Sequence, residues 1–289
     1  MSSSTSAVAV TSTAVTRRFP RISTVASATF LTISTILVLF PYLFAVSTST
    51  KTYNEFLHQF LLPTLPPTIN NYVVAWQLVS TYIWNTALVT VLSVIPSLVF
   101  ASMSAYVFAR HRFPGRDALF LVILSLIMIP GIVSLLPRFI VVMQLGLLNS
   151  YWALVLPYIS GSQVFAIFVL RTFIAELPEE LFEAARIDGA SDLQMYYQIA
   201  IPLSKAILGT LAILQTRNIW NDLIWPLMTV NNPNVRTISV GLAFLNNDQQ
   251  SLFGAVFAGY VLASLPMLLL FALTMRQFMS GLTSGALKI

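Results

Sequence analysis

Most of the acidic side chains in this 289-residue chain lie in a single segment, residues 171–205. Six of the ten acids are in this segment, against only three cations, and they are Glu176, Glu179, Glu180, Glu183, Asp188 and Asp192. Carboxylates gathered on one short segment favour contact with a basic partner. We predict no metal site, because the chain lacks cysteine and has only two histidines, and we assign no catalytic residue.

The overall composition excludes most soluble classes of protein. The chain is 57% hydrophobic, has a mean hydropathy of +0.81, and carries 25 charged residues (15 basic and 10 acidic). A soluble domain has about 25% charged residues, whereas this chain has 9%. These values predict a membrane protein with several spans. The net charge of +5 does not indicate nucleic-acid binding, because the cations are scattered between apolar runs and form no basic stripe.

Six segments are long and apolar enough to cross a bilayer, for which about 20 apolar residues are needed. They cover about 22–46, 81–109, 118–136, 151–170, 206–230 and 249–275. The sequence therefore predicts an all-α membrane protein with six transmembrane helices in a domain at 21–289, preceded by a disordered cytoplasmic tail at 1–20. The first apolar run is about 25 residues long, whereas signal peptides have roughly 7–15, so we expect an uncleaved span.

Positive charges orient these spans, because cytoplasmic loops are enriched in lysine and arginine. With the N-terminus inside, eleven cations fall on the cytoplasmic side and three (Lys51, Arg138 and Arg236) on the outer side. Both termini and the segment 171–205 are therefore predicted to be cytoplasmic. Cytoplasmic loops are usually basic, whereas this segment has a net negative charge.

The middle of the segment, residues 178–190, has the pattern of a short helix. Pro178 suits the first turn, Glu179 and Glu180 complement the positive end of the helix dipole, and Gly189 can cap the other end. A helix lying on the anionic inner leaflet would be basic, and this one is acidic. We therefore expect it to dock a cytoplasmic protein.

Small residues at four-residue spacing predict where helices pack closely. The second expected span has Ser97, Ala101, Ala105 and Ala109, and the sixth has Ala255, Gly259 and Ala263. Helices in lipid associate where small residues let their backbones approach. We expect both faces to be buried against other helices of this chain or of a partner.

The cytoplasmic segment carries a motif that resembles the EAA loop of ABC-importer permeases. Its elements are Glu183-Ala184-Ala185, Gly189, and Ile199-Ala200-Ile201-Pro202, at the spacing of that loop. Ile201 stands where leucine is usual.

Further motifs resemble the maltose-type, carbohydrate-importing branch of these permeases. They are Asn70-Asn71-Tyr72 with Trp76, Asn85-Thr86, Phe113-Pro114-Gly115-Arg116, Asn149-Ser150-Tyr151, Leu156-Pro157-Tyr158, Trp220-Asn221-Asp222 with Trp225-Pro226-Leu227, and 281–288. The resemblance covers roughly 19–289. It implies the ABC type I importer permease fold and a location in the prokaryotic plasma (inner) membrane.

The resemblance also implies partners. They are a second permease subunit, a dimer of ATP-binding subunits, an extracytoplasmic solute-binding protein and a sugar. Glu183, Ala184, Ala185, Gly189, Ile199 and Pro202 would then form the contact that couples ATP hydrolysis to transport, and Gly281, Gly285 and Lys288 a C-terminal contact with the ATPases. The chain has no G-x-x-x-x-G-K-[ST] pattern. We therefore expect no cofactor on this chain, with ATP and Mg²⁺ bound by the partner.

The path of the substrate is less defined by the sequence. Arg217, Trp220, Asn221 and Asp222 lie in the fifth expected span, where charged residues are rare and often functional. They could contact a sugar. Alternatively, Trp220 and Trp225 belong to an interfacial aromatic belt and Arg217 has a structural partner. Arg217 and Asp222 are five residues apart, so they are not expected to pair on one helix face.

Other transport classes remain open at this point. Within the importer class, a permease for a peptide or polyamine is an alternative, although the Trp-Asn-Asp and C-terminal motifs argue against it. A six-span channel is another alternative, although no selectivity-filter-like loop is evident. An ion-coupled secondary transporter would need buried acids or unwound ion sites, and the acids here cluster in the cytoplasmic segment instead.

Overall fold

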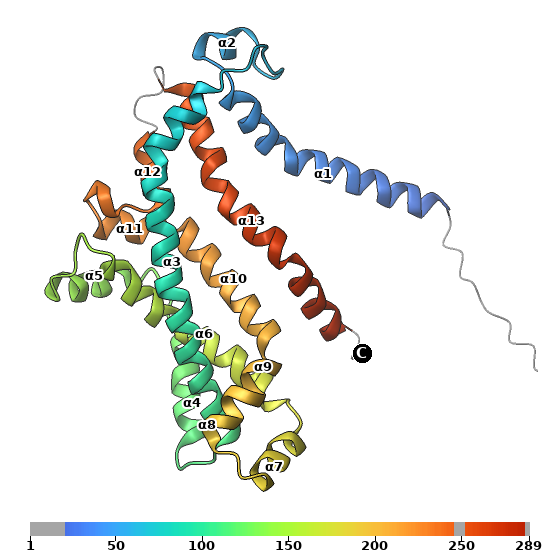
Figure 1. The fold of residues 1–289 in the computed structure, drawn as a ribbon, viewed down its shortest axis with the longest axis vertical. Helices are drawn as coiled ribbons and strands as arrows, with labels where there is room; N and C mark the ends of the chain where they lie inside the picture. The colour runs from blue at the N-terminus through green and yellow to red at the C-terminus, as the bar shows by residue number, and fades with distance from the viewer. Residues whose placement is uncertain (1–20, 246–251, 287–289) are drawn as a thin grey trace, which may run out of the picture. The chain divides into compact units, whose positions relative to one another are not determined.

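The structure is a computed structural model that describes residues 21–245 and 252–286, with side chains for 26–245 and 252–274. The described residues form helices and connecting segments and contain no strand. The chain divides into two units, residues 1–44 and 45–289, and each is considered by itself (Figure 1). The predicted tail at 1–20 lies outside the described residues.

The first unit contains most of helix α1 (Arg21–Ser49). Its side chains from Ala26 to Leu43 are exposed, apart from the half-exposed Ser34 and Tyr42, although most of them are apolar and none is charged. An apolar helix of this length with no polar face suits a hydrocarbon environment. Helix α1 covers the range 22–46 in which the first span is expected.

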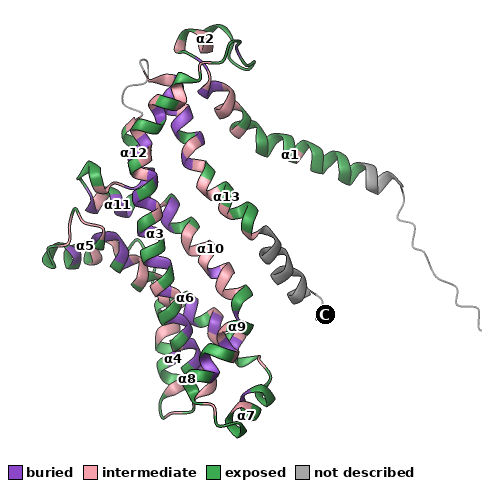
Figure 2. Ribbon diagram, in the orientation of Figure 1, coloured by how far each residue is buried: buried purple, intermediate pink, exposed green. Residues whose placement is uncertain are grey.

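The second unit is built around α3 (Asn70–Arg110), a 41-residue helix that is about 60 Å long. It packs against α6 (Trp152–Ala175), α10 (Lys205–Asn221) and α13 (Phe253–Ala286) (Figure 1). The buried residues gather along these contacts (Figure 2). Helices α3 and α6 cover nearly all of the spans expected at 81–109 and 151–170, and α13 covers the expected span at 249–275 from Phe253 onward; α3 begins eleven residues before the expected start.

Small residues lie at the closest helix contacts, as predicted. Ser97, Ala101 and Ala105 are buried, and the Ser97 hydroxyl hydrogen bonds to that of Ser162 on α6 over 2.6 Å. A Cβ atom on Gly259 would already be in van der Waals contact with Val79 Cγ1, at 3.4 Å, so α13 and α3 lie close together at this position.

The segment expected to form a span at 118–136 is helical in separate parts. The chain forms α4 (Arg116–Ser125) and a 3₁₀ turn, η1 (Leu126–Met128), then leaves helical structure until α5 (Leu135–Gln144). Pro130 has no N–H to donate and Gly131 has high backbone entropy, so helix is disfavoured at this point.

The expected span at 206–230 is also interrupted. Helix α10 ends at Asn221, Asp222 has an extended backbone, and a short α11 (Ile224–Thr229) follows. Pro226 cannot donate to the Asp222 carbonyl, so one helix through both residues would lose a hydrogen bond. The described residues contain four helices that are long and apolar enough to span a bilayer. A fifth is added if the pair 192–203 and 205–221, bent by 73°, is one span.

The Asn70 end of α3 is joined to loops on one side of the unit. Lys51 is fully buried, and its Nζ donates to the carbonyls of Gln59 (2.8 Å) and Phe60 (3.2 Å), which closes the segment containing α2 (Tyr53–His58). Burial lowers the pKa of this ammonium group below its usual range.

A second loop at this end carries η3 (Pro233–Val235) and α12 (Ile238–Leu245). It is held by residues of the motifs that resemble the importer family. Asn85 Nδ2 donates to the carbonyls of Asn234 and Arg236, and Asn149 Oδ1 accepts from the backbone N–H of Asn231 over 2.6 Å. These asparagines therefore fix the 231–236 loop to α3 and to the start of α6.

Candidate functional site: a coupling surface and a polar pocket

The acidic segment contains a short helix, α7 (Glu179–Ile187), within the predicted range 178–190. Pro178 precedes its first turn with φ −56°, and Glu179 and Glu180 occupy that turn. The helix ends before Gly189, whose φ of +81° lies in the left-handed region that glycine adopts without strain. The local signals at both ends therefore act as the sequence predicts.

Helix α7 is attached to the Arg110 end of α3 by one buried ring and one arginine. Phe182 is fully buried in a cluster with Tyr106 of α3, and Ile174 of α6. The Arg110 guanidinium lies 4.0 Å from the centre of the Phe182 ring. It donates to the carbonyls of Ile174 (2.7 Å) and Leu177 (2.6 Å) and pairs with Glu179 over 2.5 Å.

Arg110 therefore joins three elements: the end of α3, the end of α6 and the first turn of α7. Its side chain is only 5% exposed. Charge-assisted hydrogen bonds are about twice as strong as neutral ones, so this contact fixes α7 to the two long helices. From the sequence alone, Arg110 is one of the eleven cations on the expected cytoplasmic side. Spacing along the chain does not show that Arg110, at the end of α3, lies beside the acidic segment in the fold.

The other face of α7 is free in this chain. Glu183 and Ala184 are exposed, and Ala185 is half-buried. Ile187 is 87% exposed and Leu181 43%. An exposed apolar residue beside small side chains and a carboxylate is typical of a protein contact surface. We call the exposed residues Leu181, Glu183, Ala184, Ile187 and Gly189, with the half-buried Ala185, the coupling surface.

The last part of the EAA-like motif lies apart from this surface. After α8 (Asp192–Met195), a π-helical turn, η2 (Tyr196–Ala200), and α9 (Ile201–Leu203) lead into α10. Ile199 is half-buried against the same core cluster as Phe182, whereas Pro202 is exposed next to the 73° bend. These two residues therefore shape the joint between the acidic segment and α10.

The residues proposed for the substrate path do not converge. Trp220 is buried and its Nε1 donates to the Ala263 carbonyl of α13 over 3.2 Å, so it packs helices together. Arg217 and Asn221 are exposed, and Asn221 Nδ2 donates to the Arg217 carbonyl. Trp225 is buried and donates to the Ala153 carbonyl. Among the residues described, Arg217 forms no ion pair with Asp222, in agreement with their angular separation.

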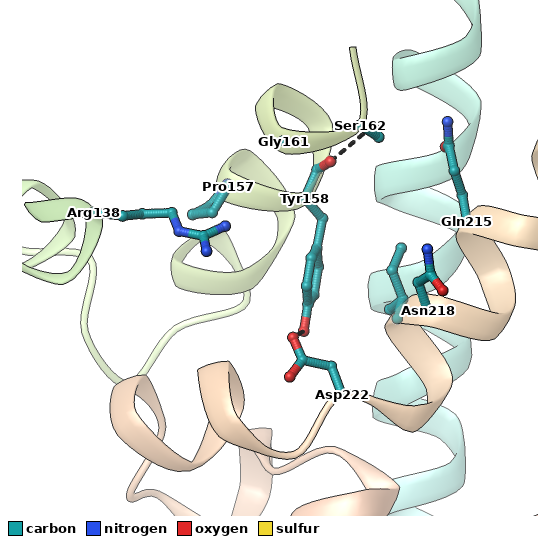
Figure 3. A pocket seen from close by; sticks show the side chains of 9 residues that line it. Arg138, Pro157, Tyr158, Gly161, Ser162, Gln215, Asn218 and Asp222 are labelled. Atoms are coloured by element: carbon teal, nitrogen blue, oxygen red, sulfur yellow. Dashed lines mark hydrogen bonds between the residues drawn. The ribbon is translucent and has the colours of Figure 1, made fainter. Parts of the chain in front are cut away.

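Asp222 instead lines a polar pocket between α5, α6 and α10. Its Oδ2 accepts a hydrogen bond from the Tyr158 hydroxyl over 2.9 Å, and its Oδ1 accepts from the Trp225 N–H over 3.3 Å. The pocket has a volume of about 220 Å³ and is lined by Arg138, Pro157, Tyr158, Gly161, Ser162, Gln215, Asn218, Ile219 and Asp222 (Figure 3).

Of the residues that line this pocket, only Asp222 is a site residue predicted from the sequence. Tyr158 belongs to a motif that resembles the importer family, and Arg138 is one of the three cations on the expected outer side. A signal was present in α10, because Gln215, Asn218 and Asp222 follow one another at helical spacing on one face. The position of Arg138 could not be predicted from the sequence, because Arg138 lies on α5 and the break at Pro130 determines where α5 lies.

The residues predicted to form the C-terminal contact lie at the end of α13 and beyond it. Gly281 and Gly285 fall within the backbone of α13, and Lys288 lies outside the described residues.

Comparison with known proteins decides the family. Residues 76–281, which include α7, α10 and the pocket, match the family described as binding-protein-dependent transport system inner membrane component. The chain belongs to this family.

The permease has relatives along most of its length. It is 33% identical over 258 residues to the arabinooligosaccharides transport system permease protein AraQ of Halalkalibacterium halodurans, which covers 87% of this chain and 92% of that protein. It is 32% identical over 261 residues to the probable ABC transporter permease protein YurM of Bacillus subtilis, covering 90% of this chain and 87% of that one.

The fold of the permease is also found in a solved structure. The crystal structure of a bacterial ABC transporter involved in the import of the acidic polysaccharide alginate contains a chain that matches with a TM-score of 0.79 and 25% identity. The match covers 90% of this chain and 97% of that chain. The predicted resemblance to ABC-importer permeases is thus confirmed, and the chain is a multi-pass membrane subunit of that class.

Proposed function

We propose that this permease imports a sugar or oligosaccharide, driven by ATP hydrolysis on separate subunits that dock on α7. The observation that carries the proposal is the coupling surface itself. It presents Glu183, Ala184 and Gly189 to a partner while Arg110 and Phe182 fix the same helix to α3 and α6. Relatives whose names specify arabinooligosaccharides and maltodextrin support the choice of sugar.

The mechanism follows from this attachment. When the two ATP-binding subunits close on ATP and Mg²⁺, they move α7. The Arg110 contact transmits the movement to the ends of α3 and α6. The long helices then alternate between arrangements open to either side of the membrane. Glu183, Ala184, Ala185 and Gly189 form the contact, and Ile199 and Pro202 hold the joint that lets α10 follow. Gly281, Gly285 and Lys288 provide a second contact with the ATPases.

The proposed topology has six crossings with both termini in the cytoplasm. The third crossing consists of α4, η1 and α5 with a break at Pro130, and the fifth of α10 and α11 with a break at Asp222. The charge bias of eleven cations to three supports this orientation. A second permease subunit, an extracytoplasmic solute-binding protein and the lipid bilayer complete the assembly.

The proposal is tested by purifying the tagged chain from native membranes and identifying what accompanies it. We expect an ATP-binding subunit, a second permease chain and a solute-binding protein. The complex is then reconstituted in liposomes and assayed for uptake of raffinose, maltotriose, arabinotriose, a tripeptide and spermidine. Uptake of one sugar that depends on internal ATP and persists with a protonophore supports the proposal. Uptake of only the peptide or the polyamine, or uptake by the isolated chain on an ion gradient, contradicts it.

A further inference from the structure

The pocket between α5, α6 and α10 contains a cationic side chain without an acceptor. Arg138 is half-buried, and its guanidinium carbon lies 4.6 Å from the centre of the Trp225 ring. Its side chain forms no hydrogen bond or ion pair with any residue in the described part of the chain, and its Nε is shielded from solvent. A shielded donor with no acceptor costs free energy, so the site favours a ligand that brings acceptor atoms.

The groups facing Arg138 across the pocket limit which ligand this can be. Asp222 lines the same pocket, so the carboxylate and the guanidinium balance each other. No ion pair within 4.0 Å joins these two described residues, so neither charge is neutralised by direct contact with the other. A free anion would lie beside Asp222 and a cation beside Arg138. A neutral ligand avoids both repulsions.

The remaining lining groups both donate and accept hydrogen bonds. Gln215 and Asn218 are three residues apart on α10, so their amides project from one face of that helix. In Figure 3, Tyr158 stands between the Arg138 guanidinium and these two amides. A sugar ring matches this arrangement, because each of its hydroxyls donates and accepts, and its C–H face can rest on an aromatic ring.

The size of the pocket matches one ring rather than a whole oligosaccharide. Its volume of about 220 Å³ is below the roughly 300–1,000 Å³ of sites for drug-sized ligands. We propose that this pocket is a saccharide subsite on this subunit, in which Arg138 donates hydrogen bonds to the hydroxyls of one neutral sugar ring. The inference rests on the proposed function and adds direct contact between this chain and its substrate.

The absence of cysteine from the chain makes a direct test possible. Asn218→Cys is introduced, the full complex is reconstituted in nanodiscs, and the thiol is labelled with the neutral reagent methyl methanethiosulfonate. Labelling of this chain is followed by mass spectrometry, without sugar and with raffinose, maltotriose, arabinotriose or an alginate trisaccharide. Gln215→Cys is the second reporter in case Asn218→Cys does not assemble. Arg112→Cys, exposed outside the pocket, is the matched control.

We expect the transported neutral sugar to slow labelling of the pocket cysteine roughly tenfold at a concentration of about ten times its Kd. Adding Arg138→Gln should return the labelling rate in sugar to within about twofold of the sugar-free rate, and the control cysteine should not respond. If the same complex transports a neutral sugar that leaves labelling of both reporters unchanged, the inference is overturned and the proposed function stands. Stronger protection by the alginate trisaccharide also overturns it. If no sugar is transported and none protects, both fail.

Discussion

Replacing Arg110 with methionine should detach α7 from the long helices while leaving the helix itself intact. Methionine keeps the apolar contact with Phe182 but removes every hydrogen bond of the guanidinium. The lost partners are the carbonyls of Ile174 and Leu177, at 2.7 and 2.6 Å, and the Glu179 carboxylate. Arg110→Lys keeps the charge but cannot reach the same three acceptors, so we expect an intermediate effect.

The size of the effect follows from these contacts. Hydrogen bonds to charged groups contribute about 1.5–3 kcal/mol each. The Glu179 side chain is 51% exposed, so its ion pair adds at most about 1 kcal/mol. Water can replace part of what the two carbonyls lose, because they lie at the end of α6. We therefore take the lower end, a loss of about 3 kcal/mol in the docking of α7, which is roughly a hundredfold change in its local opening equilibrium.

Hydrogen exchange of the backbone amides in 179–190 measures this opening in the assembled complex. We expect exchange to be roughly a hundredfold faster in the Arg110→Met complex than in the wild type, together with more ATP hydrolysed per sugar imported. Arg112→Met, two residues away and exposed, is the matched control and should exchange as the wild type does. If Arg110→Met and the wild type have the same exchange rates and the same ATP-to-sugar ratio, the coupling role of Arg110 is refuted.

Three further substitutions test other parts of the segment. Glu183→Lys reverses the charge of the coupling surface, so sugar-stimulated ATPase activity should fall at least tenfold, whereas Glu176→Lys, exposed outside α7, should retain it; equal activities would contradict the assignment. Phe182→Ala removes a fully buried ring and should cost about 3–5 kcal/mol in thermal denaturation of the complex, against under about 1 kcal/mol for the part-exposed Leu181→Ala. In Gly189→Ala the new Cβ meets no atom within 4 Å, but the residue must adopt φ +81°. We therefore expect Gly189→Ala to destabilise the turn by about 1–2 kcal/mol, and Gly189→Asn to destabilise it by less. Equal melting temperatures for the wild type and both variants would count against a strained turn.

The local features of the chain could be predicted from its sequence because local chemistry decides them. The bounds of α7 follow from Pro178 and Gly189, and the long apolar runs become α1, α3, α6 and α13. The faces that carry Ala101 and Gly259 are buried because only small residues allow helices in a membrane to approach so closely.

The features that were missed depend on how the chain bends and on distant contacts. A hydropathy argument treats 118–136 as one apolar run, but Pro130 and Gly131 stop the helix and redirect α5. That turn places Arg138 of α5 at the same pocket as Tyr158 of α6 and Asp222, which follows the end of α10. Likewise, Trp220 looks suited to a sugar, but its indole N–H is bonded to Ala263, 43 residues further along the chain. Spacing along one helix carries no information about such partners.

The most direct test of the account is a cross-link from the coupling surface. Ala184→Cys places a single thiol on the exposed face of α7 in a chain that has no other cysteine. Membranes containing the complex are treated with a photoactivatable thiol reagent, and the chain joined to this one is identified by mass spectrometry. Leu61→Cys, exposed on the loop that follows α2, is the control. The account predicts that Ala184→Cys joins this permease to an ATP-binding subunit and that Leu61→Cys does not. Cross-linking of Ala184→Cys to lipid alone, or of both cysteines to the same partner, would contradict it.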